Sequence, residues 1–155
     1  MSIVSDIEKL KKEKNAVILA HYYVDEDVQD VADYIGDSFY LSKVATKVSQ
    51  DRIIFAGVEF MGESAKILNP KKRVFMPDMN ADCPMAHMAD KDEILALREK
   101  YDDIAVVCYI NSTAELKKYS DVCVTSSNAV KIVKNLPNKN IFFIPDRNLG
   151  SYVAK

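Results

Sequence analysis

The chain has 155 residues, of which 48% are hydrophobic and 28% are charged, as in soluble globular proteins with one ordinary domain or two very small ones. Its formal net charge is -2, from 21 basic and 23 acidic residues, which argues against a broad surface for nucleic acid or anionic lipid. No segment approaches the ~18 apolar residues of a membrane span, and the N-terminus does not resemble an export signal. We therefore expect a cytoplasmic protein with no nucleic-acid or membrane partner, whose three cysteines form no disulfide.

Short apolar runs, typical of buried strands, alternate with amphipathic stretches, typical of helices. In the first half we expect, after a lysine-rich N-terminal helix, strand Ala16–Ala20, helices Asp27–Ile35 and Phe39–Val48, strand Ile53–Val58, helix Phe60–Leu68 and strand Val74–Met76. In the second half we expect helix Lys91–Tyr101, strand Ile104–Ile110, helix Ser112–Tyr119, strand Val122–Val124, helix Asn128–Leu136, strand Ile141–Ile144 and helix Asn148–Ala154. Continuously apolar strands separated by helices indicate an α/β fold with parallel sheets covered on both faces.

The sequence also resembles itself when it is shifted by 88 positions without gaps. Strand Val17–Ala20 then falls on Ala105–Cys108. Identical residues coincide at Asp33/Asp121, Ser38/Ser126, Lys43/Lys131, Ile53/Ile141, Phe55/Phe143 and Gly62/Gly150. Because polar residues coincide as well as apolar ones, we interpret the pattern as a duplication. It predicts repeated three-layer α/β/α modules with short parallel sheets, the first at residues 1–82 and the second, incomplete, at residues 83–155.

Polar side chains recur where the first strand of each module ends. His21 and Tyr23 leave the first strand two residues apart, and Tyr109 and Asn111 hold the same positions in the second module. A serine follows seventeen residues after the first member of each pair, at Ser38 and Ser126, where a helix is predicted to begin. Ligands bind beyond the carboxyl ends of parallel strands, and helix starts hold anions, so we expect these residues to line a shared pocket. Both serines are also explained as simple helix N-caps.

The remaining candidates have competing explanations. Cys83, in a polar loop close to a helix start, is either a low-pKa ligand or a chance surface cysteine. Cys108 and Cys123 lie within apolar strands, which favours small buried hydrophobic residues. Met61 is a core residue or a pocket wall, and His21 is a pocket residue or a satisfied core histidine.

Eight segments, taken together and in order, resemble the quinolinate synthase (NadA) family over the whole chain. They are Ala20-His21-Tyr22-Tyr23, Gly36-Asp37-Ser38, Ala56-Gly57-Val58-Glu59-Phe60-Met61, Ile67-Leu68-Asn69-Pro70, Cys83-Pro84-Met85-Ala86, Tyr109-Ile110-Asn111-Ser112-Thr113, Thr125-Ser126-Ser127-Asn128-Ala129-Val130 and Pro145-Asp146-Arg147-Asn148-Leu149-Gly150. The resemblance implies an enzyme of NAD biosynthesis, which condenses iminoaspartate with dihydroxyacetone phosphate to quinolinate. It also implies three α/β modules about a pseudo-threefold axis and a [4Fe–4S] cluster held by one cysteine from each module. An aspartate-oxidising enzyme that supplies iminoaspartate would be a partner.

Carried over residue by residue, the resemblance makes Cys83 the first cluster ligand. It assigns catalytic roles to His21, Tyr23 and Tyr109. It assigns substrate binding to His21, Tyr23, Ser38, Met61, Tyr109, Asn111 and Ser126. The family's other two cysteine ligands and its third module have no counterpart, since the position 88 residues after Cys83 lies beyond Lys155. We therefore expect a truncated N-terminal part that is not competent alone. The alternatives are a non-catalytic module that binds a small dicarboxylate, or an inactive partner of a full-length copy.

Overall fold

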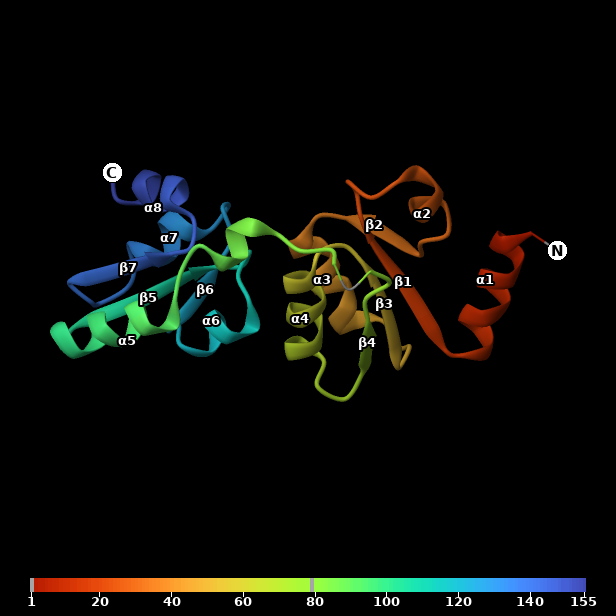
Figure 1. Cartoon of the computed structure of the whole chain (residues 1–155), viewed down its shortest axis with the longest axis horizontal. Coiled ribbons are helices and arrows are strands. Elements are labelled where there is room, and N and C mark those ends of the chain that lie inside the picture. Colours follow the sequence, from red (N-terminus) through yellow and green to blue (C-terminus); the bar gives the residue numbers. More distant parts are fainter. Residues whose placement is uncertain (1, 79) are drawn as a thin grey trace. The chain divides into compact units, whose positions relative to one another are not determined.

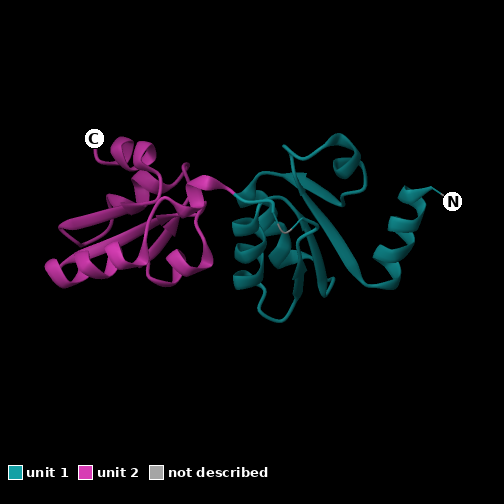
Figure 2. Ribbon diagram, viewed as in Figure 1, with its two compact units in different colours: residues 1–82 teal, residues 83–155 magenta. Residues whose placement is uncertain are grey.

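The computed structural model describes residues 2–78 and 80–155, and these residues form the predicted α/β fold. The chain separates into two compact units, unit 1 at Met1–Asp82 and unit 2 at Cys83–Lys155 (Figures 1 and 2). In each unit, helices alternate with strands of a parallel sheet. Among the described residues, no helix is long and apolar enough to cross a membrane.

Unit 1 contains a parallel sheet of four strands in the order β2-β1-β3-β4. Its central strand β1 carries some of the most deeply buried side chains of the unit, including Val17, Leu19 and Ala20. The elements of unit 1 are α1 (Ile3–Glu13), β1 (Ala16–His21), α2 (Glu26–Asp30), β2 (Tyr34–Gly36), α3 (Ser38–Lys47), β3 (Arg52–Ala56), α4 (Glu59–Leu68) and β4 (Arg73–Phe75).

Unit 2 contains a parallel sheet of three strands in the order β6-β5-β7. One face packs Ile94 and Leu116, from α5 and α6, against β5, and the other packs Ala129 and Leu149, from α7 and α8, so the unit has three layers. The elements of unit 2 are the 3-10 helix η1 (Pro84–His87), α5 (Lys91–Lys100), β5 (Ile104–Tyr109), α6 (Ala114–Lys118), β6 (Val122–Val124), α7 (Ala129–Val133), β7 (Asn140–Ile144) and α8 (Arg147–Val153).

Helix α7 begins 91 positions after α3, whereas the other corresponding elements of the two units begin 88 positions apart. This offset relates α1 to α5, β1 to β5, α2 to α6, β2 to β6, β3 to β7 and α4 to α8. The strand pairings agree as well, because His21 pairs with Gly36 in unit 1 while Tyr109 pairs with Val124 in unit 2. The two units therefore share one topology over all the elements that they have in common.

One predicted helix was wrong. The segment Asp27–Ile35 was expected to be a single helix, but α2 ends at Asp30 and the chain then forms the short strand β2. The apolar residues Val28, Val31, Ala32 and Ile35 have helical spacing, which explains the error. The repeat would have predicted this strand, because Tyr34–Gly36 corresponds to Val122–Val124, which was predicted as a strand.

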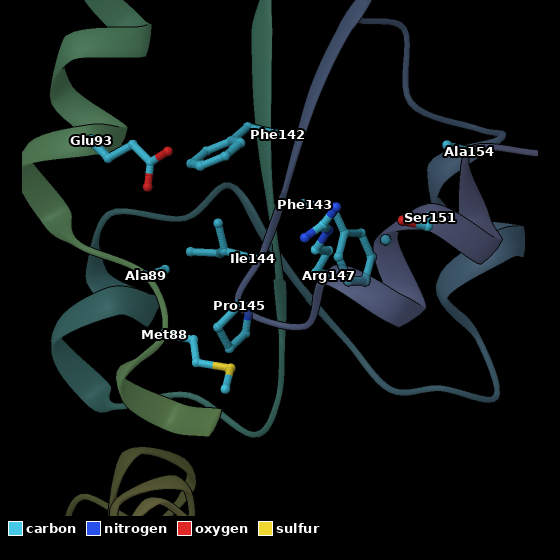
Figure 3. A pocket seen from close by; sticks show the side chains of 11 residues that line it. Met88, Ala89, Glu93, Phe142, Phe143, Ile144, Pro145, Arg147, Ser151 and Ala154 are labelled. Atoms are coloured by element: carbon cyan, nitrogen blue, oxygen red, sulfur yellow. The ribbon is translucent and has the colours of Figure 1, made fainter. Parts of the chain in front are cut away.

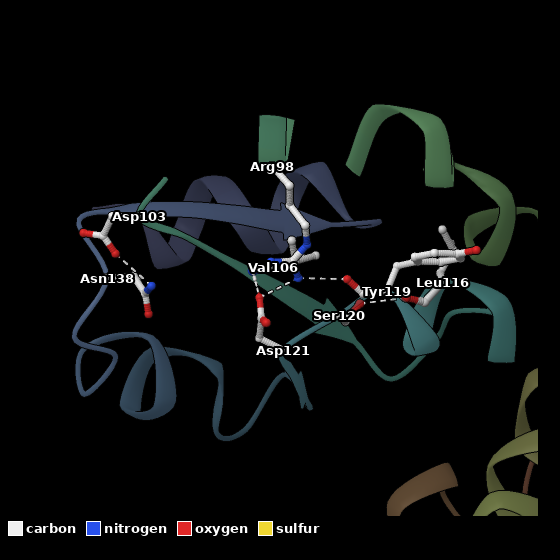
Figure 4. A network of polar contacts seen from close by, with 8 residues as sticks. All are labelled: Arg98, Asp103, Val106, Leu116, Tyr119, Ser120, Asp121 and Asn138. Carbon is white, nitrogen blue, oxygen red and sulfur yellow. Dashed lines mark hydrogen bonds and ion pairs between the residues drawn. The ribbon is translucent and has the colours of Figure 1, made fainter. Parts of the chain in front are cut away.

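A polar network holds the edge strand β6 against the centre of unit 2 (Figure 4). Asp121, just before β6, accepts a hydrogen bond from the backbone N–H of Val106 at 2.7 Å. Arg98 of α5 pairs with the same carboxylate at 2.8 Å and also donates to the carbonyl oxygen of Tyr119. These contacts satisfy backbone groups near the start of an edge strand of only three residues, and so help to define its position.

Candidate functional site

In unit 1 the structure brings together three of the expected site residues at the carboxyl end of β1. His21 is the last residue of β1 and is only 5% exposed, whereas Tyr23 is 53% exposed. Their ring centroids are 3.8 Å apart with planes inclined by 36°. The Tyr23 hydroxyl lies 3.9 Å from the sulfur of Met61, a residue of the first turn of α4 that is 3% exposed. His21 of β1, Tyr23 of the following turn and Met61 of α4 therefore form one cluster, and Met61 is both a core residue and a wall of this cluster.

The local contacts favour a neutral His21. The backbone N–H of Tyr23 donates to Nδ1 of His21 at 3.4 Å, an arrangement in which the ring proton resides on Nε2. Burial lowers the pKa of His21 below its ordinary value of 6.5, and the negative charge of Asp37 partly opposes this shift. A neutral imidazole with an Nε2–H group can donate a hydrogen bond to a substrate oxygen or exchange a proton with it.

Asp37 is a functional candidate that the sequence reasoning missed. It is the N-cap of α3, where its carboxylate accepts a hydrogen bond from the backbone N–H of Tyr40 at 2.7 Å. It also supplies the charge that acts on His21. The signal was present in the segment Gly36-Asp37-Ser38, because aspartate is among the strongest N-cap residues and directly precedes the predicted helix.

Neither serine is a helix N-cap, so this explanation was wrong for both. Ser38 is already the first residue of α3, since Asp37 takes the cap position. Ser126 lies in the turn between β6 and α7, and the N-cap of α7 is Asn128. The Asn128 side chain bonds back to the N–H of Thr125 at 2.7 Å, which closes this turn. Both serines nevertheless follow the carboxyl end of an edge strand, where a ligand could reach them.

In unit 2, Tyr109 is the last residue of β5, the position that His21 holds in β1. Its carbonyl oxygen accepts a hydrogen bond from the Ser112 hydroxyl at 2.7 Å, which shapes the loop that carries Asn111. Tyr109 and Asn111 are both half-buried, while Ser126 is exposed. Unit 2 thus repeats the arrangement of polar residues at the carboxyl end of its sheet, with a tyrosine in place of the histidine.

Cys83 is the N-cap residue of η1 and is a half-buried, reduced cysteine. The segment before it is anchored to unit 1, since the carbonyl oxygen of Ala81 accepts a hydrogen bond from the N–H of Glu59 at 2.8 Å. Glu59 begins α4, two residues before Met61. Within unit 1, this hydrogen bond ties Ala81 to the start of α4.

The other two cysteines differ in exposure. Cys108 is fully buried in β5, as predicted, but Cys123 is exposed, so its prediction as a buried hydrophobic residue was wrong. The reason is that β6 is an edge strand of only three residues. Among the described residues, no three or more His, Cys, Asp or Glu side chains gather in a group that could hold a metal ion.

A hollow on unit 2 contains none of the expected site residues. It has a volume of about 370 Å³ and extends along the open edge of β7, where Phe142 and Phe143 point to opposite faces of the sheet (Figure 3). Glu93 and Arg147 line it from α5 and α8. In unit 1 the corresponding strand edge is covered, because β4 pairs there with β3. The hollow thus lies along the edge of β7 that pairs with no strand among the described residues.

Comparison with known proteins identifies the family of this chain. The family model described as "Quinolinate synthetase A protein", NadA, matches residues 5–155. This chain belongs to that family. It is 67% identical over 149 residues to the quinolinate synthase of Fusobacterium nucleatum, covering 96% of this chain and 50% of the relative. It is 56% identical to that of Clostridium perfringens over 155 residues, covering 100% of this chain and 52% of the relative.

The chain spans about half the length of the curated NadA relatives that it matches. A further relative, the quinolinate synthase of Caldicellulosiruptor saccharolyticus, is 55% identical over 99% of this chain and 50% of its own length. The NadA family model thus matches all but the first four residues of this chain. A whole quinolinate synthase, such as the Fusobacterium nucleatum relative, is about twice as long.

Proposed function

We propose that this chain forms part of a quinolinate synthase, which condenses iminoaspartate with dihydroxyacetone phosphate to give quinolinate in NAD biosynthesis. The observation that carries the proposal is the cluster of His21, Tyr23 and Met61 at the carboxyl end of β1, in a chain that belongs to the NadA family. An enzyme that oxidises aspartate would supply the iminoaspartate.

We assign substrate binding to the polar residues at the carboxyl ends of both sheets. His21, with its proton on Nε2, and the hydroxyl of Tyr23 can donate hydrogen bonds to the oxygens of a triose. The start of α3, beside Ser38, carries the positive end of the helix dipole, which favours a carboxylate. Tyr109, Asn111 and Ser126 supply the corresponding hydroxyl and amide groups of unit 2. Met61 limits the space beside the Tyr23 hydroxyl.

We further propose that Cys83 is one thiolate ligand of a [4Fe–4S] cluster. A half-buried, reduced cysteine that ends a loop and starts a helix has the donor chemistry of such a ligand. When bound, the cluster would supply a Lewis-acidic iron that polarises a substrate oxygen or nitrogen. Among the described residues no three ligating side chains gather. We propose that the remaining ligands come from outside these residues and that the isolated chain is not competent.

The proposal is tested in a chimera in which this chain replaces the matching half of the Fusobacterium nucleatum relative. Formation of quinolinate from iminoaspartate and dihydroxyacetone phosphate is measured without oxygen. We expect an active chimera, and a loss of about 10²–10⁴-fold in kcat for His21→Ala, the range typical of a positioned acid or base. Full activity of the His21→Ala chimera would contradict the assignment.

A matched pair of tyrosine variants distinguishes loss of a hydroxyl at the proposed site from a general effect of removing a tyrosine hydroxyl. Tyr23→Phe removes a hydroxyl at the proposed site, whereas Tyr152→Phe removes one from an exposed position on α8. Only the first is expected to reduce quinolinate formation. If neither changes the activity but the isolated chain is stabilised by a dicarboxylate, the alternative function of a small-anion-binding module is favoured.

A further inference from the structure

The two cysteines that the proposed function does not use are neighbours in the sheet of unit 2. Cys108 of β5 and Cys123 of β6 are direct partners in the register of these parallel strands. Paired residues on adjacent strands point to the same face, with the strands about 4.7–4.9 Å apart. Disulfides join residues whose Cα atoms are about 4.4–6.8 Å apart, so the spacing of paired strands falls within this range.

The surroundings of the pair stabilise one thiolate, which the two sulfur atoms share through a hydrogen bond. A hydrogen bond from the Cys123 thiol lowers the pKa of Cys108 to about 6 although burial opposes the shift, with support from the hydroxyls of Ser112 and Ser120 and the charge of Lys117. The same hydrogen bond raises the pKa of Cys123, so the pair loses one proton readily and shares the other. Cys108 is 0% exposed, while Cys123 is exposed at the sheet edge, so an external reagent can reach only Cys123.

We propose that Cys108 and Cys123 form a dithiol site that exchanges with small-molecule disulfides such as oxidised glutathione, and closes a reversible disulfide between β5 and β6. The Cys123 thiolate, formed when the shared proton moves to Cys108, attacks one sulfur of the external disulfide. That S–S bond breaks and one thiolate leaves. Cys108, after losing its proton, then attacks the Cys123 sulfur and displaces the second thiolate. Two protein thiols are oxidised, and one external disulfide is reduced to two thiols that take up the two protons.

The test uses the 155-residue chain, purified in reduced form and treated with oxidised glutathione. Intact mass and peptide mapping are then measured after trapping of the remaining thiols. We expect the chain to lose the mass of two hydrogen atoms, to yield linked peptides containing Cys108 and Cys123, and to regain its original mass with dithiothreitol. A linkage that involves Cys83, or no linkage although Cys123 is alkylated readily, would overturn the proposal.

Two variants test whether Cys123 reacts before Cys108 in the exchange with glutathione, and a third variant serves as the control. Cys108→Ser should stop at a mixed disulfide of glutathione on Cys123, because the second thiol is missing. Cys123→Ser should leave Cys108 unmodified, because it is buried. Cys83→Ser should still close the internal disulfide. Glutathione on Cys108 in the Cys123→Ser variant, at unchanged circular dichroism, would contradict the proposed role of Cys123.

Discussion

Asp33 and Asp121, which lie 88 positions apart, make the same pair of contacts in the two units. Asp33 accepts a hydrogen bond from the N–H of Ile18 at 2.8 Å, and Asp121 accepts one from the N–H of Val106 at 2.7 Å. Each aspartate N–H donates in return to the carbonyl oxygen of the same partner residue at 2.9 Å. The correspondence between the two units therefore extends to specific polar contacts as well as to the hydrophobic pattern.

Each aspartate also pairs with a basic side chain from the first helix of its unit. The two basic residues are 87 positions apart, one fewer than the offset of the repeat. Lys11 of α1 lies 3.0 Å from Asp33 and donates to the carbonyl oxygen of Val31. Arg98 of α5 lies 2.8 Å from Asp121 and donates to the carbonyl oxygen of the corresponding residue, as described above. The first helix of each unit is thus tied to the segment before its edge strand by the same kind of contact.

Removal of either aspartate should destabilise its unit. Asp33→Ala and Asp121→Ala each leave a strand N–H without its acceptor, which costs about 1–3 kcal/mol of unfolding free energy. Unfolding in urea, followed by circular dichroism, measures the loss. Asp30→Ala, at the exposed end of α2, is the control and should leave the stability nearly unchanged. Equal stability of all three variants and the original chain would show that these contacts contribute nothing.

The protonation of His21 should reduce stability at acidic pH. Because the folded pKa lies below 6.5, the unfolded chain binds more protons than the folded chain between these two values. The stabilisation is therefore complete above about 6.5 and is lost as the pH falls through the folded pKa. NMR titration of the His21 ring should give a midpoint below 6.5.

Asp37→Asn provides the matched variant for this titration. Asparagine keeps the N-cap of α3 but removes the charge that raises the pKa of His21, so the midpoint should fall further. An unchanged or higher midpoint in Asp37→Asn would contradict the electrostatic coupling between these two residues.

Met61→Ala should be strongly destabilising, because Met61 is 3% exposed and its replacement leaves a cavity beside Tyr23. The expected loss is about 2–5 kcal/mol in unfolding free energy, as for other buried methionines. Met88→Ala changes the same residue type at a position that is 69% exposed and should have little effect. Thermal unfolding of the two variants compares them directly, and similar melting temperatures would contradict a structural role for Met61.

The sequence predicted the positions of the site residues better than their local contacts. His21 was placed correctly at a strand end, because a continuous apolar run that stops at a polar residue is a strong signal. Tyr109 was matched to it by the repeat of 88 positions, although its strand was predicted to continue to Ile110. The short strand β2 was missed because three largely exposed residues bury too little surface to produce a clear pattern. The N-cap of α3 was assigned one residue late, to Ser38 in place of Asp37, because both residue types favour the cap and the backbone geometry decides between them.

The role of Cys83 is the central claim, and the iron and sulfide content of the chimera, purified without oxygen, tests it most directly. The unmodified chimera should carry about four irons per chain, the content of one [4Fe–4S] cluster. Cys83→Ser should lose most of this iron, whereas Cys123→Ser, at an exposed cysteine outside the proposed site, should keep it. A full complement of iron and sulfide in the Cys83→Ser chimera would contradict the account.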